Sequence, residues 1–508
     1  MISRLLKRLH GAKKRTWFER HFMIVVGAGA VIAATISLLI GLHQSVWFDE
    51  AYSIMLAKQP ITQLVHLTAM DTHPPLYYLL LKAWAALFGW SELALRSLSV
   101  LALAGAVWFA GLLIKRTFGI RAALITLPFV VFAPFLLRYG FEIRMYALAS
   151  FIGVAATYVL VAALQTKQTH KQWVLFAVYG LLVVIGMYTL YYMALLWIAH
   201  VTWLMWLTVQ QKQPLFRSRW LLAYAGSIVL FLPWLPTFLS QVNNGALGPI
   251  AHQLTTTNLV SIVSFSFLYR PAWQLGGLLS LVMLFVMIVI TYMAIQAFKY
   301  TTKNQRPYLV LLALYILVPV LLLALISMVK PMYTERYVSH IIIGGSLFIG
   351  AATAVTLQRT HAVKVKIMAA LLIVISLLGV INLAREGNYN YQRLQKPAAN
   401  KVRSLIGGDC RHTTLVASDP YVAIELSYYF SDCPVYFYGD PARLTGGYAP
   451  LAGSPLRVTN AAETFSHVRR LVYVYQTSSQ LIVLDSLPLD QVMNRDFDSL
   501  YVTVFARQ

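Results

Sequence analysis

Long apolar stretches recur through the first three quarters of this 508-residue chain and constrain its fold more than any other feature. A helix needs roughly 20 apolar residues to cross a bilayer core of about 30 Å, and about eleven stretches approach that length. Because lipid offers the backbone no hydrogen-bond partners, these stretches are expected to be α-helices. They lie near residues 23–42, 97–114, 122–137, 147–164, 173–189, 191–209, 220–239, 274–297, 308–328, 338–356 and 367–384. The sequence therefore predicts an α-helical polytopic membrane protein.

The charged residues are few, and their signs are unevenly distributed. They make up 12 % of the chain, and 41 Lys and Arg outnumber 18 Asp and Glu to give a net charge of +23. Every second loop between the predicted helices is short and basic, and these loops together hold 21 Lys and Arg but one acid, Glu19. They are residues 1–22, 115–121, 165–172, 210–219, 299–306 and 357–366. Basic loops are typical of the cytoplasmic face, so we expect a cytoplasmic N-terminus, an external C-terminus and no nucleic-acid partner.

The composition changes near residue 385 and divides the chain into three parts. Residues 1–22 form a basic cytoplasmic N-terminus, and residues 23–385 form the membrane module, whose first external loop is 43–96. Residues 386–508 contain no apolar run long enough to span, so we expect a small external, or periplasmic, soluble α/β domain there. Short β-rich runs at 413–417, 435–438, 471–475 and 500–505 alternate in it with a helical stretch at 421–430.

The two cysteines, Cys410 and Cys433, both fall in this last domain. An external compartment permits a disulfide between them, and two buried thiols are an almost equal alternative, because sequence cannot measure their separation. The chain contains no Asn-X-Ser/Thr sequon. Because such sequons mark glycosylated surface loops in secreted proteins, their absence favours a prokaryotic plasma (inner) membrane.

The acidic residues before the C-terminal domain avoid the predicted spans. The span interiors contain no Asp, Glu, Lys or Arg and are interrupted only by His200 and His340. Intramembrane charges mark ion pathways in pumps, so an ion-coupled transporter is disfavoured. Apart from Glu19, these acids lie on the predicted external loops, as Asp49, Glu50, Asp71, Glu92, Glu142 and Glu335.

The motif Trp47-Phe48-Asp49-Glu50-Ala51-Tyr52 follows directly after the first span. Two adjacent carboxylates repel each other and should titrate apart, which suits a general base. A hydrated helix end anchored by Trp47 and Phe48 is the alternative, and the residue types favour neither interpretation.

A second motif, Asp71-Thr72-His73-Pro74-Pro75-Leu76-Tyr77-Tyr78, is followed by Lys82. The proline pair predicts an extended break and then a helix start. His73 and the free N–H groups of that helix start could face an anion such as phosphate. A capped surface loop is the alternative, although this loop is unusually aromatic and apolar.

Three further charged motifs lie on the same predicted side. Glu92 and Arg96 are spaced to support a helix, and we assign that pair a structural role. The segment from Arg138 to Tyr146 contains two arginines, one acid and two tyrosines, a set suited to a phosphate or a sugar. The segment from Lys330 to Tyr337 adds further cations. Together the motifs predict a site at headgroup depth for an anionic substrate, a phosphate on a lipid.

In this order the motifs resemble those of the GT-C superfamily of integral-membrane glycosyltransferases. The greatest likeness is to its family 39-like enzymes, the protein O-mannosyltransferases and the lipid A aminoarabinose transferases. His73 stands where the aminoarabinose transferases have Lys, and Leu190 stands where many relatives have His. The resemblance covers about residues 20–385 and rests on Asp49-Glu50, His73-Pro74-Pro75-Leu76-Tyr77-Tyr78, Glu92 to Arg96, Glu142-Ile143-Arg144-Met145-Tyr146-Ala147-Leu148, Pro233-Trp234 and Glu335-Arg336-Tyr337.

The resemblance implies an inverting glycosyltransferase of cell-envelope biogenesis, with its active site on the first external loop. Such an enzyme would move a hexose or pentose from a polyprenyl-phosphate donor to a lipid, glycan or protein acceptor on the external face. Asp49 would be the general base, with Glu50 and Glu142 as further catalytic carboxylates. The donor phosphate would be held by His73, Lys82, Arg144 and Arg336. The substrate pocket would be lined by Asp71, Tyr77, Tyr78, Tyr146 and Tyr337.

No cofactor is expected from the sequence. His73, Asp49, Glu50 and Asp71 could supply hard ligands to a divalent cation, but their spacing imposes no geometry, and we favour a metal-independent mechanism. Two other functions stay open. A lipid-linked oligosaccharide flippase or transporter would need functional charges in the spans. A membrane-anchored scaffold would bind its partners through the C-terminal domain.

Overall fold

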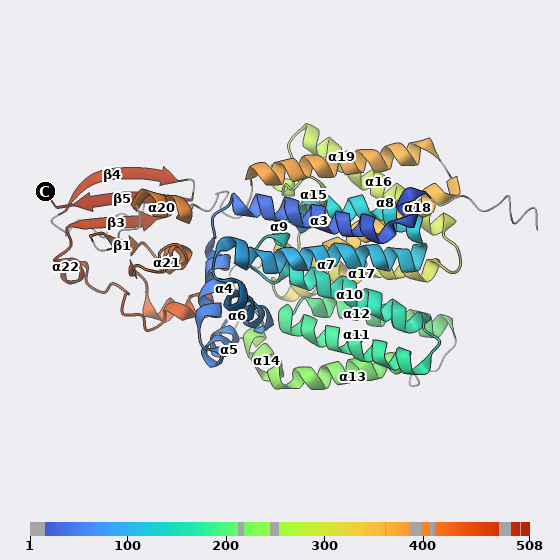
Figure 1. The fold of residues 1–508 in the computed structure, drawn as a ribbon, viewed down its shortest axis with the longest axis horizontal. Helices are drawn as coiled ribbons and strands as arrows, with labels where there is room; N and C mark the ends of the chain where they lie inside the picture. Colours follow the sequence, from blue (N-terminus) through green and yellow to red (C-terminus); the bar gives the residue numbers. More distant parts are fainter. Residues whose placement is uncertain are drawn as a thin grey trace, which may run out of the picture.

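The computed structural model has two parts, a bundle of long helices and a β-sheet domain at one end of it (Figure 1). Most of the basic segment 1–22, part of the 210–219 loop and the start of the 386–508 domain lie outside the described residues. The structure describes residues 16–211, 218–243, 253–360, 362–386, 398–406, 410, 412–476, 489–497 and 499–507.

Ten helical segments in the described residues are long and apolar enough to cross a membrane, or up to eleven if one bent helix pair counts as a span. The predicted polytopic helical fold is therefore confirmed. The long helices are α3 (Phe22–Leu42), α7 (Glu92–Phe118), α10 (Tyr146–Gln165), α11 (Thr169–Thr189), α12 (Met193–Gln210), α16 (Leu278–Tyr300), α17 (Arg306–Val329), α18 (Ser339–Thr360) and α19 (Val363–Glu386). The tenth segment joins α13 (Arg219–Phe231), the 3₁₀ turn η2 (Leu232–Trp234) and α14 (Leu235–Asn243). Short helices α2 (Trp17–Arg20) and α15 (Thr256–Phe267) and the turn η3 (Ala272–Gln274) complete the bundle.

The stretch predicted as one span at 122–137 is instead broken into two helices. α8 (Ile120–Val131) and α9 (Pro134–Gly140) meet at an angle of 64°. Pro134 causes the break, because it lacks an N–H donor and drives the preceding Ala133 out of the helical region, to ψ 108°. The bend buries all of α9, so Arg138 lies inside the protein and not on a loop.

The central helix is α18, which follows the 3₁₀ turn η4 (Glu335–Val338). The apolar window of this span is 94 % buried by protein, compared with 17 % for the Arg219–Asn243 span. Gly350 allows α18 to approach α8 closely, because a Cβ atom there would lie 2.7 Å from the Cα atom of Thr126. Since η4 carries Arg336 and Tyr337, this central position places both residues at the end of the bundle core.

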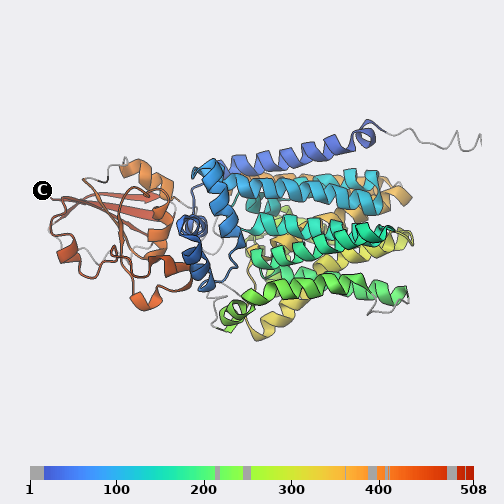
Figure 2. The ribbon, with the colours of Figure 1, turned by 60° about the horizontal axis from the view of Figure 1, so that its bottom comes forward.

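Three short helices, α4 (Phe48–Lys58), α5 (Ile61–Ala69) and α6 (Leu76–Phe88), fill most of the segment predicted as the first external loop. Figure 2 shows them between the helical bundle and the C-terminal domain. Pro60 is the N-cap of α5, and Pro75 is the N-cap of α6, so the prolines set where these helices begin.

The C-terminal domain contains a five-stranded mixed sheet in the order β2-β1-β3-β5-β4. β1 (Thr414–Ala417) is parallel to β2 (Val435–Phe437) and to β3 (Arg470–Tyr475). β5 (Leu500–Ala506) is antiparallel to β3 and to β4 (Asp490–Phe497). The other elements are α20 (Ala399–Ile406), α21 (Pro420–Ser427), α22 (Ala461–Thr464), η5 (Pro441–Arg443) and η6 (Gly446–Leu451). The domain has its own apolar core, which includes Val402, Leu415, Val422, Val472 and Val504.

A disulfide joins Cys410 to Cys433, whose Cα atoms are 5.6 Å apart. Next to it, Asp432 forms a two-pronged ion pair with Arg403 of α20, at 3.0 and 3.1 Å. The guanidinium of Arg403 lowers the pKa of the Asp432 carboxyl. These contacts attach the segment after α21 to α20.

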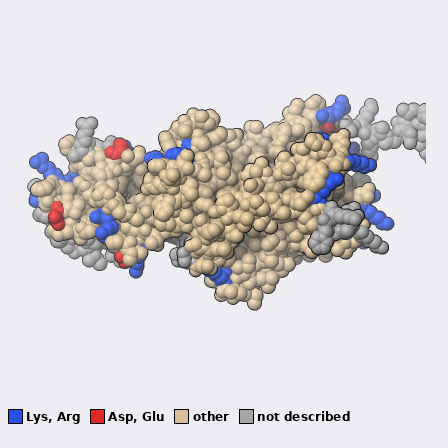
Figure 3. Space-filling view, turned by 90° about the horizontal axis from the view of Figure 1, so that it is seen from below, with Lys and Arg blue, Asp and Glu red and all other residues tan. Residues whose placement is uncertain are grey.

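The charged side chains on the face shown in Figure 3 lie mainly toward the two ends of the molecule, and the surface between them is largely uncharged. The loop after α7 and the turn between α18 and α19 lie at the end opposite the C-terminal domain (Figure 1). Both belong to the set of basic loops. Their shared position agrees with the expected topology, and the orientation in the membrane stays a prediction.

Candidate active site

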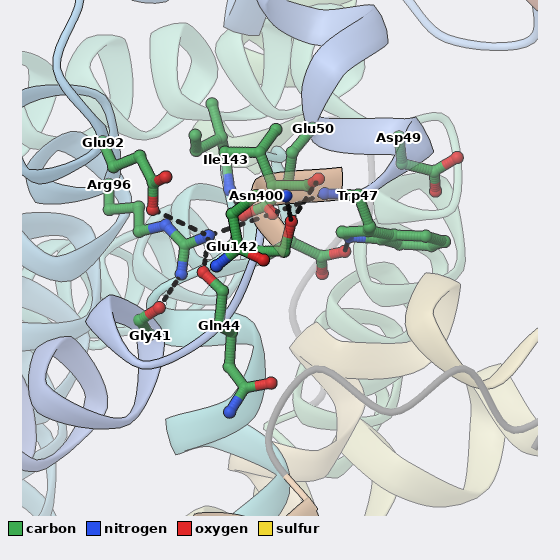
Figure 4. A network of polar contacts seen from close by, with 12 residues as sticks. Gly41, Gln44, Trp47, Asp49, Glu50, Glu92, Arg96, Glu142, Ile143 and Asn400 are labelled. Carbon is green, nitrogen blue, oxygen red and sulfur yellow. Dashed lines mark hydrogen bonds and ion pairs between the residues drawn. The ribbon is translucent and has the colours of Figure 1, made fainter. Parts of the chain in front are cut away.

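The adjacent carboxylates of α4 point in opposite directions (Figure 4). Asp49 Oδ2 accepts a hydrogen bond from Arg336 Nη1 at 2.6 Å. Glu50 Oε2 instead lies 3.3 Å from Arg96 Nη2, and both of these side chains are fully buried. Successive side chains of a helix project about 100° apart, since a turn holds 3.6 residues. One helix start therefore directs one acid toward η4 and the other toward α7.

Glu50 belongs to a buried network. It accepts hydrogen bonds from the backbone N–H of Ile143, at 3.0 Å, and of Trp47, at 3.3 Å. Arg96 donates to the carbonyl oxygens of Gly41 and Gln44. Burial raises the pKa of Glu50 to about 7, against the opposing effect of Arg96. Glu50 thus links three segments that are distant in sequence, and its catalytic role stays a prediction.

Glu142, like Glu50, has a buried carboxylate with partners in the protein. Its Oε1 accepts a hydrogen bond from Trp47 Nε1 at 2.9 Å, and its Oε2 lies 3.4 Å from Arg138 Nη1. The carboxylate is completely buried. The segment it belongs to packs tightly on the end of α3, where a Cβ atom at Gly41 would lie 2.7 Å from Phe141 Cβ. The structure therefore places Glu142 behind Trp47, as a support for the loop 141–145.

Two buried arginines face the Asp49 side of α4. Arg144 Nη1 donates to Tyr78 Oη at 3.0 Å and to Ser53 Oγ at 3.3 Å. Arg144 also interacts electrostatically with Asp49 and Arg336. Arginine keeps its charge under all ordinary conditions. The centre therefore has two fixed positive charges beside one carboxylate.

Several donors around this centre have no partner among the described residues. They are Nε of Arg144, Nε of Arg336 and the hydroxyl group of Tyr146, all buried. Tyr146 interacts electrostatically with both arginines. Buried polar groups are normally hydrogen-bonded, so this group of donors suits an anionic ligand with several acceptor oxygens.

The loop between α5 and α6 forms another wall of the centre. The His73 ring lies edge-on to the Tyr337 ring, with centroids 5.3 Å apart. Burial, together with the charges of Arg144 and Arg336, lowers the pKa of His73 well below its ordinary value. His73 is therefore neutral near pH 7 in the absence of an anion and can offer a hydrogen bond but not a charge.

Asp71 lies on the same loop and interacts electrostatically with Tyr52. Burial raises the pKa of the Asp71 carboxyl, and the nearby positive charge of Arg144 opposes the rise. Asp71, His73, Tyr78, Tyr146 and Tyr337 are thus brought together around Arg144 and Arg336, and their roles in binding a substrate stay predictions.

Tyr77 and Lys82 take other positions. The Tyr77 hydroxyl lies 3.1 Å from Ser99 Oγ, which in turn donates to the Arg144 carbonyl at 3.3 Å. Tyr77 therefore supports the Arg144 loop from behind. Lys82 Nζ donates to the carbonyl oxygens of Ala57, at 3.2 Å, and Gln59, at 2.8 Å. These carbonyls lie at the C-terminal end of α4, where a positive charge is favourable, and the role of Lys82 in phosphate binding stays a prediction.

Residues 72–236 match the family model described as dolichyl-phosphate-mannose-protein mannosyltransferase. The matched segment includes His73, Glu142 and Arg144. The match covers about a third of the chain and is to a GT-C mannosyltransferase-like family model. The family resemblance that the motifs indicate is thereby confirmed. No curated protein matches the chain by sequence.

Two solved structures share the fold of nearly the whole chain. One is ArnT from Cupriavidus metallidurans in the apo state, with a TM-score of 0.62 and 12 % identity over 95 % of this chain and 97 % of that one. The other is the same protein bound to undecaprenyl phosphate, with a TM-score of 0.64 and 12 % identity over 95 % and 98 %. At this identity the likeness establishes a common fold, including the C-terminal domain.

One contact in the GT-C module has no signal in the sequence. Gln241 of α14 is buried, and its side-chain amide donates to the carbonyl oxygens of Thr68, at 2.8 Å, and Asp71, at 2.7 Å. Its own carbonyl oxygen accepts from the Tyr191 hydroxyl at 2.6 Å, and that hydroxyl accepts from Trp234 Nε1 at 2.7 Å. The Pro233-Trp234 motif thus holds Gln241 against the loop that carries Asp71 and His73.

Within the described ranges, no three His, Cys, Asp or Glu side chains are grouped as metal ligands. The carboxylates that could have served have other partners, since Asp49 contacts Arg336 and Glu50 contacts Arg96. Whether a divalent cation takes part in the reaction stays a prediction.

Proposed function

We propose that the protein transfers a sugar from a polyprenyl-phosphate donor to an acceptor in the external leaflet or beyond it. The observation that carries this proposal is the pair of buried arginines, Arg144 and Arg336, beside Asp49, with Nε donors that have no partner among the residues that the structure describes. The fold shared with an ArnT that was solved with undecaprenyl phosphate supports a lipid-linked phosphate as the ligand.

The donor phosphate would lie against Arg144 and Arg336. Their fixed charges would offset the charge that develops on the phosphate oxygen as the bond to the sugar breaks. Because both guanidinium groups are held in place by protein contacts, little reorganisation is needed when the donor binds. Neutral His73 would add one hydrogen bond, and its pKa would rise once an anion is bound beside it.

Asp49 would act as the general base. In the proposed single displacement, the acceptor oxygen forms a bond to the anomeric carbon while the bond between that carbon and the phosphate oxygen breaks. The acceptor proton passes to Asp49, and polyprenyl phosphate leaves as the anion, with inversion at the sugar. The 2.6 Å contact between Arg336 and Asp49 joins the base directly to a phosphate-binding cation, so donor binding would also set the position of the base.

Glu50 and Glu142 would act through position and not through contact with substrate. Both carboxylates are completely buried and accept hydrogen bonds from the loop 141–145 or from Trp47. They would fix the distance between α4, which carries Asp49, and the loop that carries Arg144. We propose a mechanism that needs no metal ion, because the two arginines can supply the positive charge.

The site would face the outside of a plasma membrane. The basic loops lie at the opposite end of the bundle from α4 and the C-terminal domain (Figures 1 and 3). Because basic loops stay on the cytoplasmic side, this arrangement supports a cytoplasmic N-terminus and an external active site.

A transfer assay tests the proposal. The purified full-length protein would be mixed with radiolabelled undecaprenyl-phosphate sugars, each tested in turn, and with membrane extracts as the source of acceptor. We expect label to move to an extract component with one of these donors and Arg336→Gln to abolish the transfer. A protein that moves the intact donor across vesicles without transferring label would be a flippase, and this result would overturn the proposal.

A further inference from the structure

The C-terminal domain packs directly on the helix that carries Asp49. Phe48, the residue before Asp49, is stacked on Tyr421 of α21, with ring centroids 4.3 Å apart and planes at 5°. Tyr448 of η6 approaches the same ring from another side, at 5.7 Å. Figure 1 shows α21 and α4 on the two sides of this junction. The start of α4 is therefore held between the membrane module and the C-terminal domain.

Tyr429, just after α21, makes the central polar contact of this junction. Its hydroxyl accepts a hydrogen bond from the backbone N–H of Val46 at 2.7 Å. It also contacts Ser45 Oγ at 3.3 Å and donates its proton to Glu92 Oε1 at 2.7 Å. One hydroxyl thus joins the segment leading into α4 to the first turn of α7.

The Tyr429 contact continues to the buried network behind Asp49. Glu92 Oε2 lies 3.8 Å from Arg96, and Arg96 lies 3.3 Å from Glu50. Glu50 in turn accepts from the N–H of Trp47 at the start of α4. Tyr429 therefore reaches the start of α4 by two routes, directly through Val46 and indirectly through Glu92, Arg96 and Glu50.

We propose that Tyr429 is a positioning residue through which the C-terminal domain fixes Asp49 against Arg336. The proposal rests on the proposed glycosyl transfer, in which Asp49 is the base. Val46 is three residues before Asp49, so a small rotation of this segment would displace the carboxylate from the acceptor oxygen. A misplacement of about 1 Å can slow a reaction roughly a hundredfold.

The Tyr429 ring packs against both the core of the helical bundle and the core of the C-terminal domain. A phenylalanine at this position keeps that ring and removes only the hydroxyl group. Removing one hydroxyl should therefore leave both parts folded. The adjacent Tyr428 supplies a matched control, because its hydroxyl donates to the carbonyl of Trp90 at 3.1 Å, in the same junction but outside the route to Glu50.

The experiment compares Tyr429→Phe and Tyr428→Phe with the wild type in the full-length protein. We expect Tyr429→Phe to lower kcat by about ten- to a hundredfold, with the donor KM and the melting temperature unchanged. Tyr428→Phe should retain wild-type kcat. Equal kcat for wild type and Tyr429→Phe, or equal losses in the two variants, would overturn the proposal.

A double-mutant cycle with Glu92→Gln gives an independent measurement. If Tyr429 acts through Glu92, the effects of the two substitutions on kcat should be clearly less than additive. Strictly additive effects would exclude this route. A wild-type protein that transfers no sugar from any donor would instead contradict the proposed function itself, so the two failures are distinguishable.

Discussion

Arg336 of η4 donates a hydrogen bond to Asp49 of α4 at 2.6 Å, across a sequence separation of 287 residues. The guanidinium also lies over the Trp47 ring, 5.7 Å from its centroid. Trp47 in turn contacts Glu142. The proposed base, a phosphate-binding cation and the support of the Arg144 loop are therefore parts of one contiguous arrangement.

Replacing Arg336 tests the need for its planar two-pronged donor group. We expect Arg336→Lys to lose much of the activity although it keeps the charge, because a lysine cannot contact Asp49 and a phosphate in the same geometry. Loss of one such electrostatic contact costs about a hundredfold or more in kcat. Steady-state kinetics at saturating donor would measure the effect. Wild-type kcat in Arg336→Lys would show that a point charge is sufficient.

Replacing Glu50 tests the cost of burying its charge. The folded-state pKa of about 7 lies above the ordinary value of 4.5, so the folded protein holds this proton more tightly than the unfolded chain. Stability contributed by the protonated form is present at low pH and is lost as the pH rises from about 5 to about 7. We expect Glu50→Gln to melt with a weaker pH dependence than the wild type in this range. Parallel melting profiles would contradict the raised pKa.

Replacing Lys82 distinguishes a structural role at the end of α4 from the predicted contact with the donor phosphate. Its ammonium group contacts the end of α4, so Lys82→Met should lower the melting temperature slightly and leave the donor KM unchanged. The loss corresponds to about 0.3–1 kcal/mol for a cation at a helix C-terminus. A large increase in the donor KM would restore the role in phosphate binding that the sequence suggests.

We expect Gln241 to affect binding of the donor more than the position of the proposed base, Asp49. Its side chain holds the backbone of Thr68 and Asp71, and removing it should loosen the loop that carries His73. We predict a higher donor KM for Gln241→Ala with a smaller change in kcat. Thr255→Ala is a suitable control, because Thr255 caps α15 and its hydroxyl contacts Asn258. A donor KM equal to that of the wild type would argue against the contact.

A chelator tests the role of metal ions. The proposed mechanism places the positive charge on Arg144 and Arg336, so transfer should persist after dialysis against EDTA. Activity that disappears on chelation and returns with a divalent cation would require a metal-dependent mechanism instead.

The sequence predicts the membrane fold well because each span is a local pattern. It is less successful where distant contacts decide the structure. Strand β4 was not predicted, because Asp490–Phe497 is an exposed edge strand with polar residues on both faces and no apolar alternation. The break between α8 and α9 had a signal in Pro134, but a proline alone does not show whether a span bends or continues.

In the candidate site, too, the sequence reveals local motifs but not the contacts between distant residues. The sequence identifies Asp49, His73, Arg144 and Arg336 because each lies in a compact charged motif. No local pattern reveals that Trp47 and Arg138 contact the Glu142 carboxylate, and its predicted catalytic role is still to be tested. Tyr429 could not be found at all, because its partner Val46 is 383 residues away.

The most direct test of the central claim is the rate of sugar transfer by Asp49→Asn at saturating donor. The amide keeps the size of the side chain but cannot take the acceptor proton, and general-base catalysis contributes about a hundred- to ten-thousandfold. Binding of undecaprenyl phosphate, measured by thermal shift, would serve as the folding control. We predict a rate lower by at least about a hundredfold with binding retained. A rate equal to that of the wild type would contradict the assignment of Asp49 as the base.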